Sequence, residues 1–363
     1  MPVRAGDPIA IYYHESMARY DLGEGHPFRA NRFTQFMELL EGMEPSLPGV
    51  EVRLPNKAMD GDLLLAHTPE YVRVVKELAR HCGHLSVDTP LTTDMVDAAM
   101  MIVGAALDGA EWIAGMECST AVTFGGFHHA GRTYGEGFCV FNDVAIAAQA
   151  LLDRYGMNRV LILDTDAHQG NGTMDIFWEE PRVLFISIHQ DPKTLYPGRG
   201  FAWEIGEGEG KGYTVNIPMP AYSGNRQYEY ALRELYLPLC KEFNPDAIIR
   251  NGGADPHHSD ELTNLSLDLR GLEMVGRIVR EGVDMTSGKL LDLMVSGYGP
   301  MTPYGWLALF SGVTGISMDY ASGAGEEKLH RSQTTETMLD ELARAAVMQV
   351  KAYLKDYWGC LRG

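Results

Sequence analysis

Short, almost continuously apolar segments alternate with helical patterns along this chain, and this alternation constrains the fold more than any other feature. The expected strands are residues 121–124, 160–163, 183–188, 213–217, 247–249 and 293–295. Near-continuous apolarity is typical of parallel strands that are covered on both faces. Apolar residues at three- and four-residue spacing predict helices at residues 143–155, 226–243, 271–285 and 335–357. The pattern predicts a three-layer α/β fold, with a central, mostly parallel sheet and helices on both faces.

The length of 363 residues would allow two domains of roughly 150 residues each. We find no internal repeat and no low-complexity linker, so we predict a single domain over residues 1–363 that ends in a helical segment at about 333–358. Thr68 is a candidate N-cap of a further helix, with Pro69 in its first turn.

Charge and cysteine content narrow the classes of partner and compartment. The net charge of −19 argues against nucleic acid as a partner. It could steer a cationic substrate, or serve only solubility.

The 5 cysteines form no CxxC, which fits a reducing compartment rather than a disulfide framework. The N-terminus lacks the apolar core of a signal peptide, and the apolar run 98–107 is too short to span a bilayer. We therefore expect a soluble, cytoplasmic protein that does not bind a membrane.

Asp164, Asp166 and His168 directly follow the expected strand 160–163. The alternation of side chains in an extended segment puts all three on one side. Two carboxylates and an imidazole that converge need a cation, and this donor set suits Zn²⁺ or a similar divalent metal. The alternative is a polar turn in which Gly170 and Gly172 form the loop.

Three more polar clusters follow expected strands. Asp255 could supply a third metal ligand and leave a position open for water, although Asp-Pro also opens ordinary turns. His128 and His129 could bind metal or shuttle protons, or form an incidental pair. Tyr298, flanked by glycines, could donate to a developing oxyanion, or be a packed aromatic. Cys139 has apolar neighbours, which favour a buried structural thiol over a nucleophile.

In this order, the motifs resemble the histone-deacetylase superfamily, and most of all its acetoin-utilisation (AcuC-type) deacetylases. The resemblance covers a core of about residues 8–320 and implies the arginase/deacetylase-like form of the predicted fold. It rests on the histidine pair, Gly137-Phe138-Cys139, Asp164-x-Asp166-x-His168-x-Gly170-Asn171-Gly172, Asp255 and Tyr298.

The resemblance implies a role for each matching residue. One catalytic Zn²⁺ per chain would be bound by Asp166, His168 and Asp255. His129, oriented by Asn171, would be the general base, and His128, paired with Asp164, would help to protonate the leaving amine. Tyr298 would donate to the substrate oxygen. Gly137 would accept a hydrogen bond from the substrate amide, and Phe138 and Tyr196 would wall a narrow tunnel. The family's structural K⁺ would use Asp164, Asp166, His168, Ser187 and Ile188, and a second alkali site would lie near Phe177, Val183 and Tyr213.

The implied activity is zinc-dependent hydrolysis that removes an acetyl group from an N-acetylated, cationic amine, with acetyl-lysine of proteins as the first candidate. Acetylated polyamines or other small amides are the alternative substrates, and a non-catalytic acyl- or acetate-binding protein is the alternative class. A binuclear, arginase-like hydrolase would need more aspartates near His168. Departures from the family pattern at Phe124-Gly125-Gly126-Phe127 and Ser296-Gly297 leave the tunnel shape open. The substrate, acyl length, cellular metal (Zn or Fe) and oligomeric state also stay open.

Overall fold

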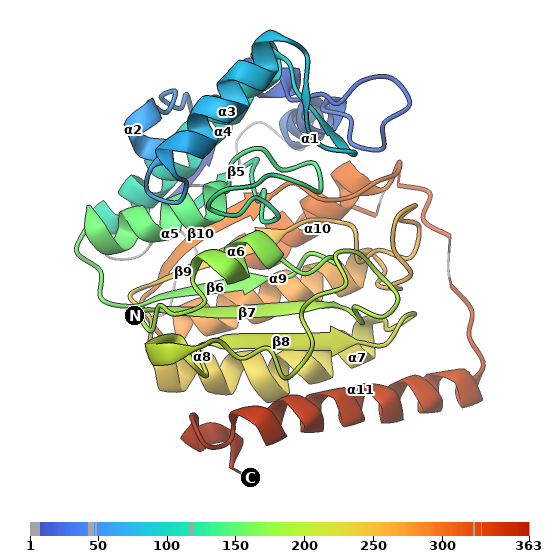
Figure 1. Ribbon diagram of the computed structural model, residues 1–363. Helices are drawn as coiled ribbons and strands as arrows, with labels where there is room; N and C mark the ends of the chain where they lie inside the picture. The colour runs from blue at the N-terminus through green and yellow to red at the C-terminus, as the bar shows by residue number, and fades with distance from the viewer. Residues whose placement is uncertain are drawn as a thin grey trace.

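A central sheet of eight strands forms the middle of the molecule in the computed structural model, which describes residues 8–42, 47, 49–116, 119–321, 324–327 and 329–362 (Figure 1). All the paired strands in it run parallel. From one edge to the other, the order is β2 (Val50–Arg53), β1 (Ile9–Tyr12), β5 (Ser119–Thr123), β10 (Lys289–Met294), β9 (Ala247–Gly252), β6 (Val160–Asp164), β7 (Val183–Gln190) and β8 (Thr214–Met219). A separate antiparallel pair joins β3 (His84–Ser86) and β4 (Thr89–Pro90).

Helices cover both faces of this sheet. They are α1 (Asn31–Gly42), α2 (Asp60–Leu63), α3 (Pro69–Arg80), α4 (Thr93–Gly115), α5 (Asp143–Asp153), α6 (Asn171–Ile176), α7 (Asn225–Ala231), α8 (Leu237–Phe243), α9 (Leu269–Asp284), α10 (Thr302–Thr314) and α11 (Gln333–Leu354). A π-helical turn, Leu232–Tyr236, joins α7 to α8, and short 3₁₀ turns lie at Glu15–Arg19, Gly208–Gly210 and Gly359–Leu361. The predicted three-layer α/β architecture is therefore confirmed.

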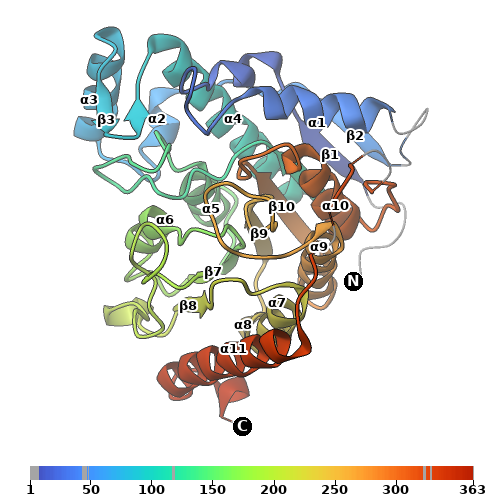
Figure 2. The same cartoon turned by 90° about the vertical axis from the view of Figure 1, so that its right-hand side faces the viewer.

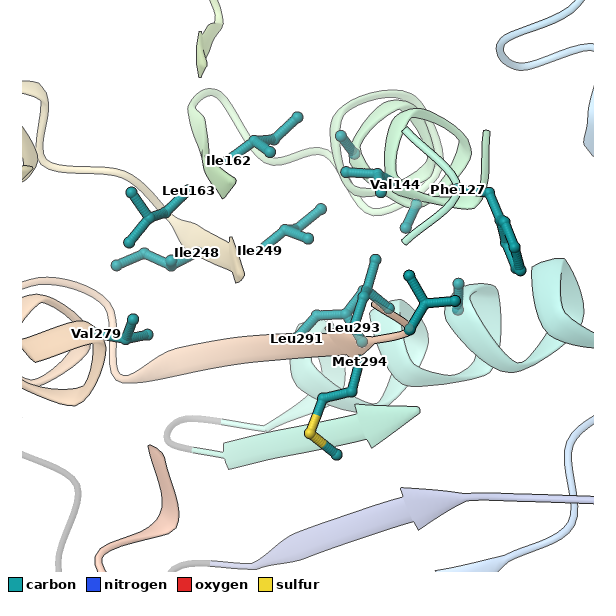
Figure 3. Close-up of a cluster of buried hydrophobic side chains, with 14 of the residues drawn as sticks. Phe127, Val144, Ile162, Leu163, Ile248, Ile249, Val279, Leu291, Leu293 and Met294 are labelled. Atoms are coloured by element: carbon teal, nitrogen blue, oxygen red, sulfur yellow. The ribbon is translucent and has the colours of Figure 1, made fainter. Parts of the chain in front are cut away.

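Alternating side chains of the central strands reach opposite helical layers (Figure 3). Leu163 and Ile248 point toward Val279 of α9, whereas Ile162 and Ile249 point toward Val144 of α5. All six side chains are buried. Burial on both faces explains why these strands read as continuous apolar runs rather than as alternating ones.

Side-chain caps fix the starts of several helices, among them α3 and α5. The backbone N–H of Tyr71 donates to Thr68 Oγ1 at 3.3 Å, as predicted for α3. At α5 the cap is Asn142, whose Oδ1 accepts from Ala145 N at 2.8 Å. Asp143 is the first residue of α5, and its carboxylate accepts from backbone N–H groups of the loop before that helix.

Some predicted boundaries were wrong. The strand expected at residues 293–295 is β10, which begins at Lys289 and ends at Met294. Asp292 interrupts its apolar run and forms a buried ion pair of 2.5 Å with Arg250 of β9. The apolar run 98–107 is part of the longer helix α4, which is long and apolar enough to cross a membrane, but 67% of its most apolar window is buried in the fold. Strands β1 and β2 were not predicted.

Candidate active site

The predicted catalytic and metal-binding groups lie at the carboxyl ends of four strands that are neighbours in the sheet. β5, β10, β9 and β6 are consecutive in the strand order, although they are far apart along the chain. Ligands bind at this edge of open parallel sheets. Figure 2 looks onto this edge. The groups on or just after these strands are, in strand order, His128 with His129, Tyr298, Asp255, and Asp164 with Asp166 and His168.

Asp166, His168 and Asp255 converge on one point. Nδ1 of His168 lies 3.1 Å from Asp166 Oδ1 and 3.2 Å from Asp255 Oδ2. Their ligand atoms all lie within 4.8 Å of one another, and all three residues are buried. Asp255 is held in place, because its carboxylate accepts from Ser296 Oγ at 2.6 Å and from Ala167 N at 2.9 Å.

The two buried carboxylates of this trio favour a positive charge beside them. Burial raises the pKa of Asp255 well above its usual range, and the negative charge of Asp166 raises it further. Burial lowers the pKa of His168, but its contacts with the two carboxylates outweigh burial and raise that pKa to about 10. A divalent cation would relieve the crowding of the carboxylates. Two aspartate oxygens and one imidazole nitrogen fit Zn²⁺ with a position left open.

The two histidines of the pair have different hydrogen-bond partners. The Nε2 atoms of His128 and His129 are 3.1 Å apart. Nδ1 of His128 lies 2.7 Å from Asp164 Oδ2, and Nδ1 of His129 lies 2.7 Å from Asn171 Oδ1. Burial lowers the pKa of both rings, but at His128 the charges of Asp164 and Asp166 outweigh it and raise the pKa to about 9. At His129 burial and the charge of His128 together lower the pKa well below its usual value. A protonated His128 therefore lies beside a neutral His129.

Asn171 determines which nitrogen of His129 is free. The side-chain oxygen of Asn171 can only accept, so Nδ1 of His129 carries the hydrogen and Nε2 keeps its lone pair. The amide of Asn171 is itself oriented by Glu136, because Asn171 Nδ2 donates to Glu136 Oε1 at 2.7 Å. Glu136 had no predicted role. Its place between two glycines gave no signal that its carboxylate would reach a residue of α6.

A cavity of about 300 Å³ opens beside these groups. Phe138, Tyr196 and Tyr298 all line it. The centroid of the Tyr298 ring lies 5.8 Å from that of Phe138, and the Tyr196 ring lies 5.1 Å from the ring of His129. Burial raises the pKa of Tyr298 well above its usual value, and the charge of Asp166 adds to that effect. Tyr298 therefore stays protonated and able to donate.

Gly137 lets the backbone approach His129 closely. Its φ is +55°, and a Cβ added there would lie 2.6 Å from His129 Cδ2. A side chain at this position would collide with the imidazole as well as strain the backbone.

The residues predicted for the two alkali ions lie in different places, the first set beside the site and the second set at the amino ends of β7 and β8. Asp164 and Ser187 are register partners on β6 and β7, and Ile188 follows Ser187. Phe177 directly follows α6, Val183 begins β7, and Tyr213 precedes β8. The potassium assignments stay predictions.

Three supporting residues had no sequence signal for their roles. The buried guanidinium of Arg32 donates to the carbonyls of Val295 and Gly297 at 3.2 and 2.5 Å. Asp143 accepts from the backbone N–H groups of residues 126 and 127, both at 2.8 Å, and so shapes the loop before the histidine pair. Asp260 accepts from the backbone N–H of residue 298 at 2.7 Å and holds the tyrosine in place.

Comparison with known proteins agrees with this geometry. The family model described as "Histone deacetylase domain" matches residues 26–312. A probable deacetylase of Archaeoglobus fulgidus is 34% identical over 362 residues, covering 97% of this chain and 99% of the relative. The acetoin utilization protein AcuC of Bacillus subtilis is 33% identical over 323 residues, covering 85% of this chain and 83% of the relative. The crystal structure of the HDA15 HD domain superposes with a TM-score of 0.83 at 25% identity, covering 97% and 98% of the two chains.

The fold, the site and these matches define the class of the protein, a hydrolase that acts on acetylated amides. The chain belongs to the histone deacetylase family and is AcuC-like within it.

Proposed function

We propose that the protein is a zinc-dependent amidohydrolase that removes the acetyl group from N-acetylated amines, with acetyl-lysine of proteins as its main substrate. One observation carries this proposal. Asp166, His168, the histidine pair and Tyr298 all line the cavity of about 300 Å³, and Asp255 completes the trio with Asp166 and His168.

The trio would hold the Zn²⁺. When bound there, the ion would polarise the amide carbonyl and make water a competent nucleophile near neutral pH. Side chains of the protein carry out the proton transfers and stabilise the developing negative charge. Nε2 of His129 is neutral and has a free lone pair, so it accepts the proton of the attacking water.

Tyr298 and the histidine pair complete the reaction. The hydroxyl of Tyr298 donates to the oxygen of the former carbonyl as negative charge develops on it. The protonated His128, held by Asp164, keeps a second proton close to His129, because the two Nε2 atoms are 3.1 Å apart. The pair can then protonate the amine nitrogen as the C–N bond breaks, and acetate and a free amine are released.

The lining of the cavity supports an acylated alkyl amine as substrate. Phe28, Phe127, Phe138, Leu195, Tyr196 and Leu262 give apolar walls that suit the methylenes of a lysine side chain. Tyr196 is 41% exposed, so this wall reaches the surface, where a peptide could enter. Asp88 also lines the cavity and could attract a cationic group near the amide. A diamine would satisfy the same carboxylate, which keeps acetylated polyamines as the second candidate.

Measuring acetate release distinguishes between the candidate functions. The zinc-loaded protein would be incubated with an acetyl-lysine peptide and, separately, with an N-acetylated diamine, and chelator-treated protein would be the control. We expect faster turnover of the peptide, abolished by the chelator. Turnover of the diamine alone would move the function to small-molecule hydrolysis. Acetate from neither substrate, with zinc bound, would favour a binding protein over an enzyme acting on acetyl groups.

A further inference from the structure

A second cluster of metal-ligating side chains lies outside the active site. Among the described residues, two groups of three or more histidine, cysteine or acidic side chains bring their ligand atoms within 4.8 Å of one another. One is the active-site trio. The other is His257, His258 and Glu326, which we call the HHE cluster. None of its members has a role in the proposed reaction.

The HHE cluster joins two segments that are far apart in the sequence. The two histidines lie in the loop that begins at Asp255 and runs to α9, whereas Glu326 lies in the connection from α10 to α11, which descends on the right of Figure 1. Nε2 of His257 lies 2.8 Å from Glu326 Oε1, and Nε2 of His258 lies 3.7 Å from the same oxygen. The two imidazole rings are stacked, with centroids 4.3 Å apart.

Each member of the cluster is held in place by contacts outside it. Nδ1 of His257 lies 2.9 Å from Ser259 Oγ and 3.2 Å from the backbone N of the same residue. When Nε2 of His257 binds a metal, Nδ1 carries the hydrogen and donates it to Ser259 Oγ. The backbone N–H of His258 donates to the carbonyl of Leu267 at 2.8 Å. Glu326 Oε1 accepts from the backbone N–H of Leu269 at 2.9 Å. The donor atoms are therefore arranged before any ion binds.

His258 supplies the observation that points to a ligand. Its Nε2 atom is buried and has no hydrogen-bond partner, although it faces a carboxylate. His257 alone can satisfy Glu326 by a hydrogen bond, so the second nitrogen is unexplained by an ordinary ion pair. A cation between the imidazoles and the carboxylate would use all three groups at once.

We propose that His257, His258 and Glu326 bind a second divalent metal ion of the zinc type. Two imidazole nitrogens and one carboxylate oxygen are a donor set that Zn²⁺ accepts, with one coordination position left open. His258 and Glu326 line a cavity of about 830 Å³, so that open position faces solvent-filled space. The ion would tie the connection that leads to α11 onto the loop that carries Asp255.

The test is the metal stoichiometry of the full chain, measured without reference to activity. Chelator-stripped protein would be titrated with Zn²⁺ against a chromophoric chelator, and with Co²⁺ to follow its visible absorption. We expect two ions per wild-type chain. His258→Gln and Glu326→Gln should each bind one, and Asp166→Asn should lose the active-site ion and keep the other. His330→Gln is the matched control, because His330 is an exposed histidine that lines the same cavity. It should still bind two.

The proposal is overturned if the wild-type chain binds one ion, or if both HHE variants still bind two. A proton shared by His258 and Glu326 instead of a metal would give the first of these results. Far-ultraviolet circular dichroism verifies that each variant is folded, and Glu326→Gln changes only a partly exposed side chain if His258→Gln proves unstable. Two bound ions without acetate release would refute the proposed function alone, whereas one bound ion with acetate release would refute the second site alone.

Discussion

Replacing Tyr298 by phenylalanine removes one hydroxyl from the proposed site and leaves its surroundings intact. The residue is positioned through its backbone N–H, which donates to Asp260, and through its ring, which packs 5.8 Å from Phe138. Phenylalanine keeps both contacts, so the fold and the metal site should be unchanged. The hydroxyl is protonated at every practical pH, because burial raises its pKa well above the usual value. Loss of one such donor should lower kcat by about 10²–10³-fold, or about 2.7–4 kcal/mol.

The assay is acetate release under saturating substrate, together with zinc content and thermal unfolding of the same samples. Tyr236→Phe is the matched control, since Tyr236 is a fully buried tyrosine whose hydroxyl donates to the carbonyl of Val279 at 3.2 Å. That variant should lose about 0.5–1.5 kcal/mol of stability and keep its turnover. Tyr298→Phe should keep its stability and lose most of its turnover. Wild-type kcat in Tyr298→Phe, with zinc bound, would refute the role that we assign to this hydroxyl.

Three further predictions concern residues around the histidine pair. Glu136→Ala removes the acceptor that orients the amide of Asn171 and should lower kcat about tenfold. Glu136→Gln can still accept through its side-chain oxygen and should keep most of the activity. Equal rates for the two variants would contradict the orienting role. Gly137→Ala puts a Cβ 2.6 Å from the ring of His129 and should lower kcat about 10²-fold without loss of zinc, as measured by acetate release and metal analysis. Burial raises the pKa of Asp143 to about 6 from 3.8, so the folded chain binds this proton more tightly than the unfolded chain. The contribution of Asp143 to the free energy of unfolding should therefore fall by about 3 kcal/mol as pH rises from about 4 to 6, and urea unfolding across that range should show a flatter profile for Asp143→Asn.

The alternation of apolar runs predicts the layers of this fold but not the order of its strands. The hydrophobic periodicity and the amino-acid composition of a segment are local properties. The strand order β5-β10-β9-β6 depends instead on pairing between segments that are far apart in the chain. The short strand β1 and the edge strand β2 escaped prediction. β2 is Val-Glu-Val-Arg, whose outer position leaves its side chains partly exposed and removes the continuous apolar signal.

The same distinction separates the site residues that could be predicted from those that could not. Asp166, His168 and Asp255 follow strands directly, so the rule for parallel sheets brings them to one edge. Arg32 and Glu136 act through contacts with residues far away in sequence, such as the carbonyl of residue 297 and the amide of residue 171. No local pattern encodes such a contact, and only the folded chain shows it.

The arrangement of His128 and His129 explains why two adjacent and chemically identical side chains can take different roles. With their Nε2 atoms 3.1 Å apart, one proton can lie between the rings, but two would repel each other. The carboxylate of Asp164 stabilises a cationic His128, and the neutral amide of Asn171 gives His129 orientation without favouring its charge. A carboxylate in place of Asn171 would favour protonation of both rings and remove the lone pair that the base needs. In the proposed reaction, the difference between an aspartate on β6 and an asparagine at the start of α6 would therefore determine which histidine accepts a proton and which one holds it.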